Sequence, residues 1–142
     1  MNPPYRGSCL CETIRFEVDA FLPQAAHCHY SMCRKFHGAA LATFGSLARE
    51  HFRWLHGQSA LQHYTASNGS VRAFCQHCGS NVSFFSPLAH QQVIEIALGL
   101  FDDAIPVTPD AHIYVGSGAN WIQTPDGLTH YQEGRESQQM LK

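Results

Sequence analysis

Two short cysteine motifs, far apart in the sequence, constrain the fold of this chain more than any other feature. Cys9 and Cys11 form a Cys-x-Cys motif, and Cys75 and Cys78 form a Cys-x-x-Cys motif. The motifs are separated by 75 − 11 = 64 residues. Each motif offers two thiolates, and two such motifs complete a tetrahedral four-cysteine site of the kind that holds structural zinc. We therefore expect the chain to fold back and bring both motifs around one zinc ion.

Other uses of these cysteines fit the sequence less well. A redox Cys-x-x-Cys usually opens a helix in a βαβ setting, and no such pattern surrounds Cys75. Six cysteines would also allow three disulfides. The N-terminal segment MNPPYRGSCLC, however, lacks the basic and then apolar stretches of a signal peptide. We therefore expect a cytoplasmic protein, in which thiols stay reduced and bind metal.

The composition narrows the class of protein and its partners. The chain has 142 residues, of which 44% are hydrophobic and 14% charged, so we expect one globular domain over residues 1–142. No apolar run approaches the 18 residues or so that a membrane span needs. The net charge is −2 and the arginines are scattered, so we expect neither nucleic acid nor an anionic membrane as a partner.

Short segments with alternating or continuous apolar residues predict a mainly β fold. Asn68-Gly69 marks a tight turn that predicts a hairpin. The only helix that we expect is short, from Ser31 to Phe36, with Gly38 as its stop. The polar tail, residues 133–142, is expected to be loose. The predicted strands cover residues 13–18, 52–57, 61–66, 71–75, 81–85, 92–101 and 111–116.

The central segment HCHYSMCRKFHG, residues 27–38, is rich in groups that bind metals. Cys28 and Cys33 give two ligands, whereas a catalytic zinc generally has three protein ligands and one open position. Tyr30 would be a poor third ligand, because its phenol has a reference pKa of about 10. A disulfide between the two cysteines is also compatible with their spacing. The side chains that could supply the third ligand are His27, His29 and His37.

Four motifs together resemble the glutathione-dependent formaldehyde-activating enzymes, a family that includes centromere-protein-V-like members. The motifs are GSCLCETIRFEV, CHYSMCRKFHGAALATFGSL, FCQHCGSNV and PDAHIYVGSGANW, and the resemblance runs from about Gly7 to Tyr131. It implies a β-tent built of antiparallel sheets and held by zinc. It also implies that Cys9, Cys11, Cys75 and Cys78 are structural zinc ligands, and that Cys28 and Cys33 are two ligands of a second, catalytic zinc.

The same resemblance implies a reaction, and Tyr30 sets this chain apart within it. Members that resemble the prototype enzyme have Cys-His-Cys-Ser-x-Cys where this chain has Cys-His-Tyr-Ser-Met-Cys. The implied activity is a carbon–sulfur lyase that joins glutathione or another thiol to formaldehyde or a related aldehyde. Tyr30 would then donate a hydrogen bond to the substrate, and Arg34 would pair with a glutathione carboxylate. The alternative is a non-catalytic or repurposed member, with one structural zinc, that binds a small molecule or a protein.

Overall fold

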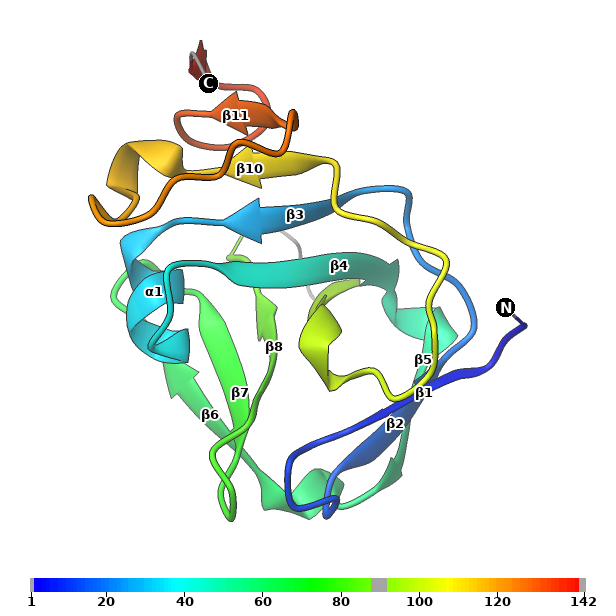
Figure 1. Ribbon diagram of the computed structural model, residues 1–142. Coiled ribbons are helices and arrows are strands. Elements are labelled where there is room, and N and C mark those ends of the chain that lie inside the picture. Colours follow the sequence, from blue (N-terminus) through cyan, green and yellow to red (C-terminus); the bar gives the residue numbers. More distant parts are fainter. Residues whose placement is uncertain (1, 88–91, 141–142) are drawn as a thin grey trace. The chain divides into compact units, whose positions relative to one another are not determined.

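The computed structural model describes residues 2–87 and 92–140, and within them the chain is mainly β, as predicted. The chain forms two compact units, which are described separately here (Figure 1). The first unit comprises Met1–Pro23 and Gly45–Val107, and the second comprises Gln24–Phe44 and Thr108–Lys142. This division does not test the prediction of one domain over residues 1–142. None of the described helices is long and apolar enough to cross a membrane.

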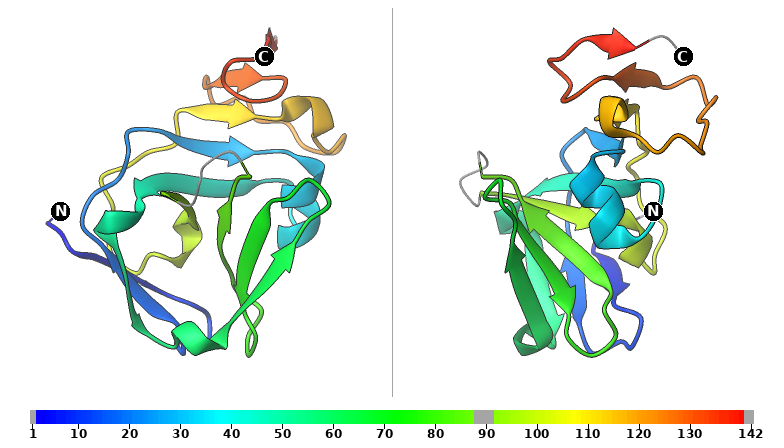
Figure 2. Two further views of the ribbon diagram at one scale, coloured as in Figure 1. Left: turned by 180° about the vertical axis from the view of Figure 1, so that it is seen from behind. Right: turned by 90° about the vertical axis from the view of Figure 1, so that its left-hand side faces the viewer.

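The first unit consists of antiparallel strands. Strands β1 (Tyr5–Ser8), β2 (Arg15–Val18) and β5 (Phe52–His56) form one sheet in that order. Four further strands are β6 (Leu61–Thr65), β7 (Val71–Cys75), β8 (Asn81–Phe85) and β9 (Val93–Ala97). Each pairs with the next in antiparallel orientation, and β6, β7 and β8 lie side by side in Figure 2.

The core of the first unit follows from the alternation seen in the sequence. On β2, Phe16 and Val18 are fully buried while Arg15 is exposed. The ring of Phe16 packs on those of Phe52 and Phe101, with centroids 5.5 and 5.3 Å apart. Burial of one such ring contributes about 2–3 kcal/mol. Cys9 and Cys75 belong to the same buried cluster, so the two cysteine motifs lie against the core.

The predicted strands of the first unit are confirmed, although several are one or two residues shorter than expected and one is half its expected length. The segment 92–101 is a strand only over Val93–Ala97, and Leu98–Leu100 form a 3-10 helix instead. Strand β1 was not predicted, nor was β4 (Ala42–Ala48), which begins in the second unit and ends in the first. The other 3-10 helices of this unit are Arg49–His51 and Gln58–Ala60.

The second unit contains the short strands β3 (Ala25–Cys28), β10 (Ala111–Ile113), β11 (Thr129–Tyr131) and β12 (Gln139–Met140). β10 pairs in parallel with both β3 and β11, whereas β11 and β12 are antiparallel (Figure 2). The sequence led us to expect antiparallel sheets throughout. Parallel pairing is possible here because residues 114–128 form a long connection, and a parallel crossover needs about a dozen residues or more.

Helix α1 (Ser31–His37) follows β3 and confirms the predicted helix. Tyr30 occupies the N-cap position, and Gly38 ends the helix in a left-handed conformation with φ of 62°. The Gly38 amide donates to the Arg34 carbonyl at 2.7 Å, which closes the last turn. This backbone conformation favours glycine, so the prediction that Gly38 ends the helix is confirmed.

The prediction of a loose tail is wrong for residues 133–140. Arg135 donates two hydrogen bonds to the Asp110 carboxylate, at 2.6 and 3.2 Å, and one to the Ala25 carbonyl at 3.0 Å. Strand β12 then pairs with β11. Polar composition indicated solvent exposure, but it could not show that one arginine anchors the segment to β3. Residues 141–142 lie outside the described part of the chain.

The Gly57→Ala substitution should strongly destabilise the protein. Gly57 has φ of 76°, and a Cβ built there would lie 2.0 Å from the Thr13 carbonyl oxygen. Gly38→Ala is the matched control, because Gly38 also has a positive φ but has no atom within 4 Å of such a Cβ. We expect a loss in unfolding free energy of about 1 kcal/mol for Gly38→Ala and about 3 kcal/mol or more for Gly57→Ala. Urea denaturation of both variants measures the difference, and equal losses would contradict the steric account.

Candidate functional site

The two predicted cysteine motifs meet within the first unit. The sulfur atoms of Cys9, Cys11, Cys75 and Cys78 lie within 4.8 Å of one another. The Cys9–Cys11 and Cys11–Cys75 sulfur distances are 3.6 and 3.8 Å. A tetrahedral zinc with Zn–S bonds of about 2.3 Å separates its sulfur ligands by about 3.8 Å. The four thiols therefore form a group that fits one tetrahedral metal ion.

Backbone amides point at the buried sulfurs of this group. The Ile14 amide lies 3.3 Å from the Cys9 sulfur, and the His77 amide lies 3.4 Å from the Cys75 sulfur. Such N–H groups stabilise a thiolate over a thiol. Burial has the opposite effect on Cys9 and raises its pKa to about 11. Bringing this thiol to the thiolate form thus depends on a cation at the centre of the group.

A hydroxyl group links the two motifs. The Ser80 hydroxyl lies 3.3 Å from the Cys78 sulfur and also accepts a hydrogen bond from the Leu10 amide at 2.9 Å. Burial acts to raise the pKa of Cys78, but hydrogen bonding with Ser80, together with that to Cys11 and Cys75, outweighs it and the pKa falls to about 5. Ser80 therefore both favours the thiolate and orients the loop that carries Cys9 and Cys11.

The predicted second centre, in the second unit, contains Cys28 and Cys33 but no complete ligand set. Cys28 ends β3, Cys33 lies in α1, and both side chains are buried. Their sulfur atoms are 3.3 Å apart, so the two thiols are in contact but do not form a disulfide. Among residues 2–87 and 92–140, no third histidine, cysteine or carboxylate forms a metal-binding group with this pair.

The three histidines considered as third ligands have other contacts. His27 stacks on His112 with ring centroids 4.8 Å apart. His29 places its Nε2 2.7 Å from Nδ1 of His112. The ring of His37 packs edge-on against Phe44, with centroids 5.4 Å apart.

Tyr30 lines a pocket instead of joining the sulfur pair. Its ring packs against Tyr114, with centroids 4.9 Å apart. The pocket has a volume of about 350 Å³, within the range usual for small-molecule sites. Burial raises the pKa of Tyr114, and negative charge at Cys28 raises it further. The residues that line the pocket are Tyr30, Tyr114, Gly116, Ser117, Gln132 and Glu133.

The backbone beside the pocket is unusual at Tyr114. This residue has φ of 58°, and its amide donates to the Glu133 carbonyl at 2.8 Å. A bulky residue in this conformation costs free energy and is found most often at functional sites. Arg34, which we expected to bind a carboxylate, donates from Nε to the Ser117 carbonyl at 3.2 Å. Arg34 therefore orients Ser117, which lines the pocket.

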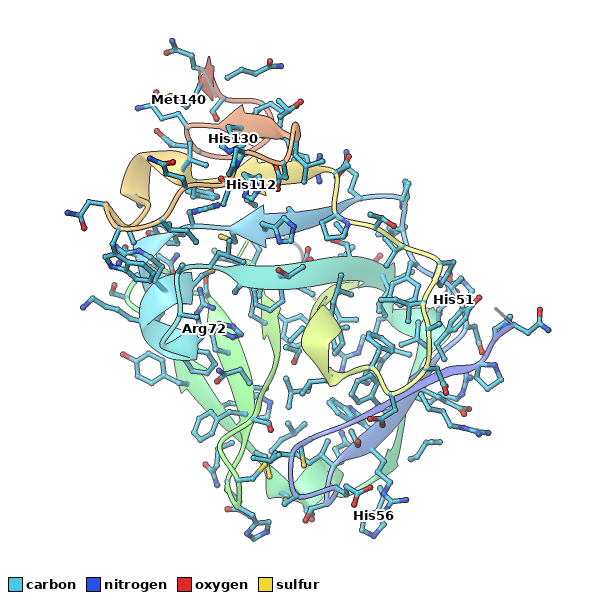
Figure 3. All side chains as sticks on the ribbon, in the orientation of Figure 1. His51, His56, Arg72, His112, His130 and Met140 are labelled. Carbon is cyan, nitrogen blue, oxygen red and sulfur yellow. The ribbon has the colours of Figure 1, made fainter. Side chains whose placement is uncertain are left out.

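A stack of histidine rings in the second unit was not foreseen. His27, His112 and His130 occupy matching positions on the parallel strands β3, β10 and β11. Adjacent ring centroids are 4.8 and 4.4 Å apart, and Figure 3 labels His112 and His130 on their neighbouring strands. The Ala-His pairs at 26–27 and 111–112 were a signal, but only the parallel register shows that they meet.

Hydrogen bonds join this stack to a carboxylate. His112 is 1% exposed, and its Nε2 lies 2.7 Å from Oδ2 of Asp126. This hydrogen bond lowers the pKa of Asp126 to about 2. Burial, together with repulsion from His112, lowers the pKa of His29 to about 4. His27, His112 and Asp126 form a second group of side chains that could hold a metal ion.

Comparisons with known proteins agree with this architecture. The chain is similar to a Rhodobacter sphaeroides protein of known crystal structure, with a TM-score of 0.59 and 20% sequence identity. The match covers 71% of this chain and 91% of that one, and at this identity it supports the fold alone. A comparison with curated proteins found no match. The family profile described as "Glutathione-dependent formaldehyde-activating enzyme" matches residues 4–117. With four paired cysteines in place and most of its length matched, the chain belongs to the glutathione-dependent formaldehyde-activating enzyme family.

Proposed function

We propose that this chain is a zinc-binding enzyme of the carbon–sulfur lyase class, which joins a thiol such as glutathione to formaldehyde or a related aldehyde. Family membership supports the reaction class. The observation that carries the proposal is the pocket lined by two phenols, Tyr30 and Tyr114, that pack against each other. Two phenol groups suit an oxygen that gains negative charge during the addition.

Zinc in the first unit would have a structural role. The group of Cys9, Cys11, Cys75 and Cys78 fills all four positions of a tetrahedral ion, so no position stays open for substrate. Four thiolates select zinc or an iron–sulfur cluster, and sulfur distances of 3.6 and 3.8 Å suit a single ion. Zinc would hold the turn after β1 against the turn after β7.

In the proposed reaction, the residues that line the pocket would bind and orient the substrates. The thiol sulfur attacks the carbonyl carbon, a C–S bond forms, and the thiol proton ends on the former carbonyl oxygen to give the S-hydroxymethyl product. The phenols of Tyr30 and Tyr114 would donate hydrogen bonds to that oxygen. Glu133 would pair with the ammonium group of glutathione, and Gln132 and Ser117 would bind its amides.

Cys28 and Cys33 fit a catalytic zinc only in part. A zinc ion there would lower the pKa of a bound thiol and polarise the aldehyde. The described residues supply two of the three side-chain ligands that such an ion usually has. The proposed reaction therefore includes no step through an ion at this pair.

The incomplete ligand set favours a second candidate function. In this alternative the chain is a repurposed family member, in which one structural zinc holds the fold and the Tyr30 pocket binds a small molecule without turning it over. The two candidates predict the same fold and the same pocket. They differ in whether the protein accelerates the thiol addition.

Cys11→Ser should remove zinc and much of the stability of the first unit. Cys11 is exposed, so the substitution removes a ligand with little effect on core packing. Structural zinc contributes about 10–16 kcal/mol in small zinc domains, so we expect a loss of several kcal/mol and near-zero zinc at the four-cysteine site. Elemental analysis and thermal unfolding measure both. Cys33→Ser is the control, and it should leave the four-cysteine zinc in place. Full zinc retention by Cys11→Ser would contradict the assignment.

Tyr30→Phe should lower kcat/KM for the addition of glutathione to formaldehyde about threefold to tenfold, the effect of losing one hydrogen bond. Exchange NMR with ¹³C-formaldehyde measures the rate at equilibrium, above the uncatalysed background. Tyr64→Phe removes an exposed phenol from β6 and is the matched control, with no change expected. If the wild-type protein does not exceed the background rate, the lyase proposal fails and the binding module is favoured.

A further inference from the structure

We propose that His27, His112 and Asp126 form a metal site of two imidazole nitrogens and one carboxylate, separate from both cysteine groups. The ligand atoms of the three side chains lie within 4.8 Å of one another. They come from β3, from β10 and from the connection between β10 and β11. The proposal does not rest on the lyase activity.

The strand register brings the two imidazoles together. His27 and His112 are direct partners in the parallel pair β3–β10, so their side chains project from the same face. Their rings are stacked, with centroids 4.8 Å apart and planes at 29°. Successive residues of a strand point to opposite faces, so Cys28 projects away from the face that carries His27. An ion held by the histidines is thus distinct from one held by the sulfur pair.

Each imidazole also has a partner that orients it for metal binding. Nδ1 of His27 lies 2.7 Å from the Thr43 hydroxyl, and Nδ1 of His112 lies 2.7 Å from Nε2 of His29. A metal-binding histidine usually makes such a bond through its second nitrogen, which fixes the ring and its tautomer. Nε2 is therefore the nitrogen that each ring can offer to the ion. In His112 this nitrogen already points at Asp126.

A small movement of Asp126 would admit the ion. The present distance between Nε2 of His112 and the Asp126 oxygen is 2.7 Å, that of a hydrogen bond. Two ligands of a tetrahedral zinc, with bonds of about 2.0–2.1 Å, lie about 3.3 Å apart. Asp126 sits in a turn, and its side chain is 40% exposed, so the carboxylate has room to withdraw.

The donor set predicts the class of metal. Two imidazoles and one carboxylate with an open position suit zinc, iron(II), cobalt(II) and similar divalent transition metals, whereas magnesium and calcium prefer all-oxygen ligands. Binding would move the proton of His112 from Nε2 to Nδ1, which would donate it to Nε2 of His29, and the proton of His29 would move from Nε2 to Nδ1. His29 is then a positioning residue, since it bonds to the second nitrogen of His112 and is not a ligand of the ion.

Two substitutions separate metal binding from mere hydrogen bonding. Asp126→Asn keeps an oxygen that can accept the His112 N–H bond but removes the charge that an ion requires. His130→Gln removes the third ring of the stack, 4.4 Å from His112, without removing a proposed ligand. It is therefore the matched control for loss of ring packing.

The test is a titration of the full-length protein, preloaded with one equivalent of zinc, with cobalt(II). Zinc stays in the four-cysteine group because cobalt binds such sites more weakly. We expect one further equivalent of cobalt to bind and to show ligand-field bands without thiolate-to-cobalt charge transfer. Asp126→Asn should weaken this binding at least tenfold, and His130→Gln should change it less than threefold.

Three results would overturn the proposal: no second equivalent, a charge-transfer band that places cobalt at Cys28 and Cys33, or unchanged affinity in Asp126→Asn. Should that variant fail to fold by circular dichroism, a measurement on the wild-type protein decides instead. Paramagnetic broadening by the bound cobalt should be strongest for the imidazole signals of His27 and His112. Broadening centred on other residues would also contradict the proposal.

Discussion

The closure of four cysteines into one group is the constraint on which the first unit depends. Cys9 and Cys11 lie in the turn between β1 and β2, while Cys75 ends β7 and Cys78 lies in the turn that follows it. Cys9 and Cys75 belong to the buried cluster around Phe16. Without a cation, burial gives Cys9 a pKa near 11, and the neighbouring thiols compete for the same protons. With a cation, the four sulfurs become ligands of one ion, which cross-links residues that are 64 positions apart, 75 − 11. The amides of Ile14 and His77 and the Ser80 hydroxyl then act as its outer shell.

Much of the first unit, and the short helix of the second, could be predicted from the sequence, because their determinants are local. The spacing within each cysteine motif fixes a turn, the alternation around Phe16 fixes a face, and Gly38 fixes the end of α1. Each of these signals acts over a few residues and has one favoured conformation. The presence of two such motifs, each with two thiols, also predicted that they meet around one ion, and the family resemblance agreed with this.

The remainder depended on contacts that no local pattern records. Parallel pairing of β3 with β10 places His27 beside His112, although 85 positions, 112 − 27, separate them in the chain. The sequence indicated that His27 was a candidate ligand for an ion shared with Cys28, yet Cys28 projects to the other face of β3. Tyr30 was expected at the mouth of a site, and the structure places it on a pocket with Tyr114, whose strained backbone no propensity predicts. The anchoring of the tail by Arg135 is likewise a tertiary contact between distant polar residues.

The second unit therefore contains two separate groups of potential ligands: a buried pair of thiols, and stacked imidazoles beside a carboxylate. The central claim, that the four cysteines bind the first zinc as a closed structural site, is tested most directly by X-ray absorption at the zinc edge of protein loaded with one equivalent. The account predicts a shell of four sulfurs at about 2.3 Å and no nitrogen or oxygen neighbour. A shell that contains nitrogen or oxygen at about 2.0–2.1 Å would contradict it, because the first zinc ion would then be bound by other residues than the four cysteines alone.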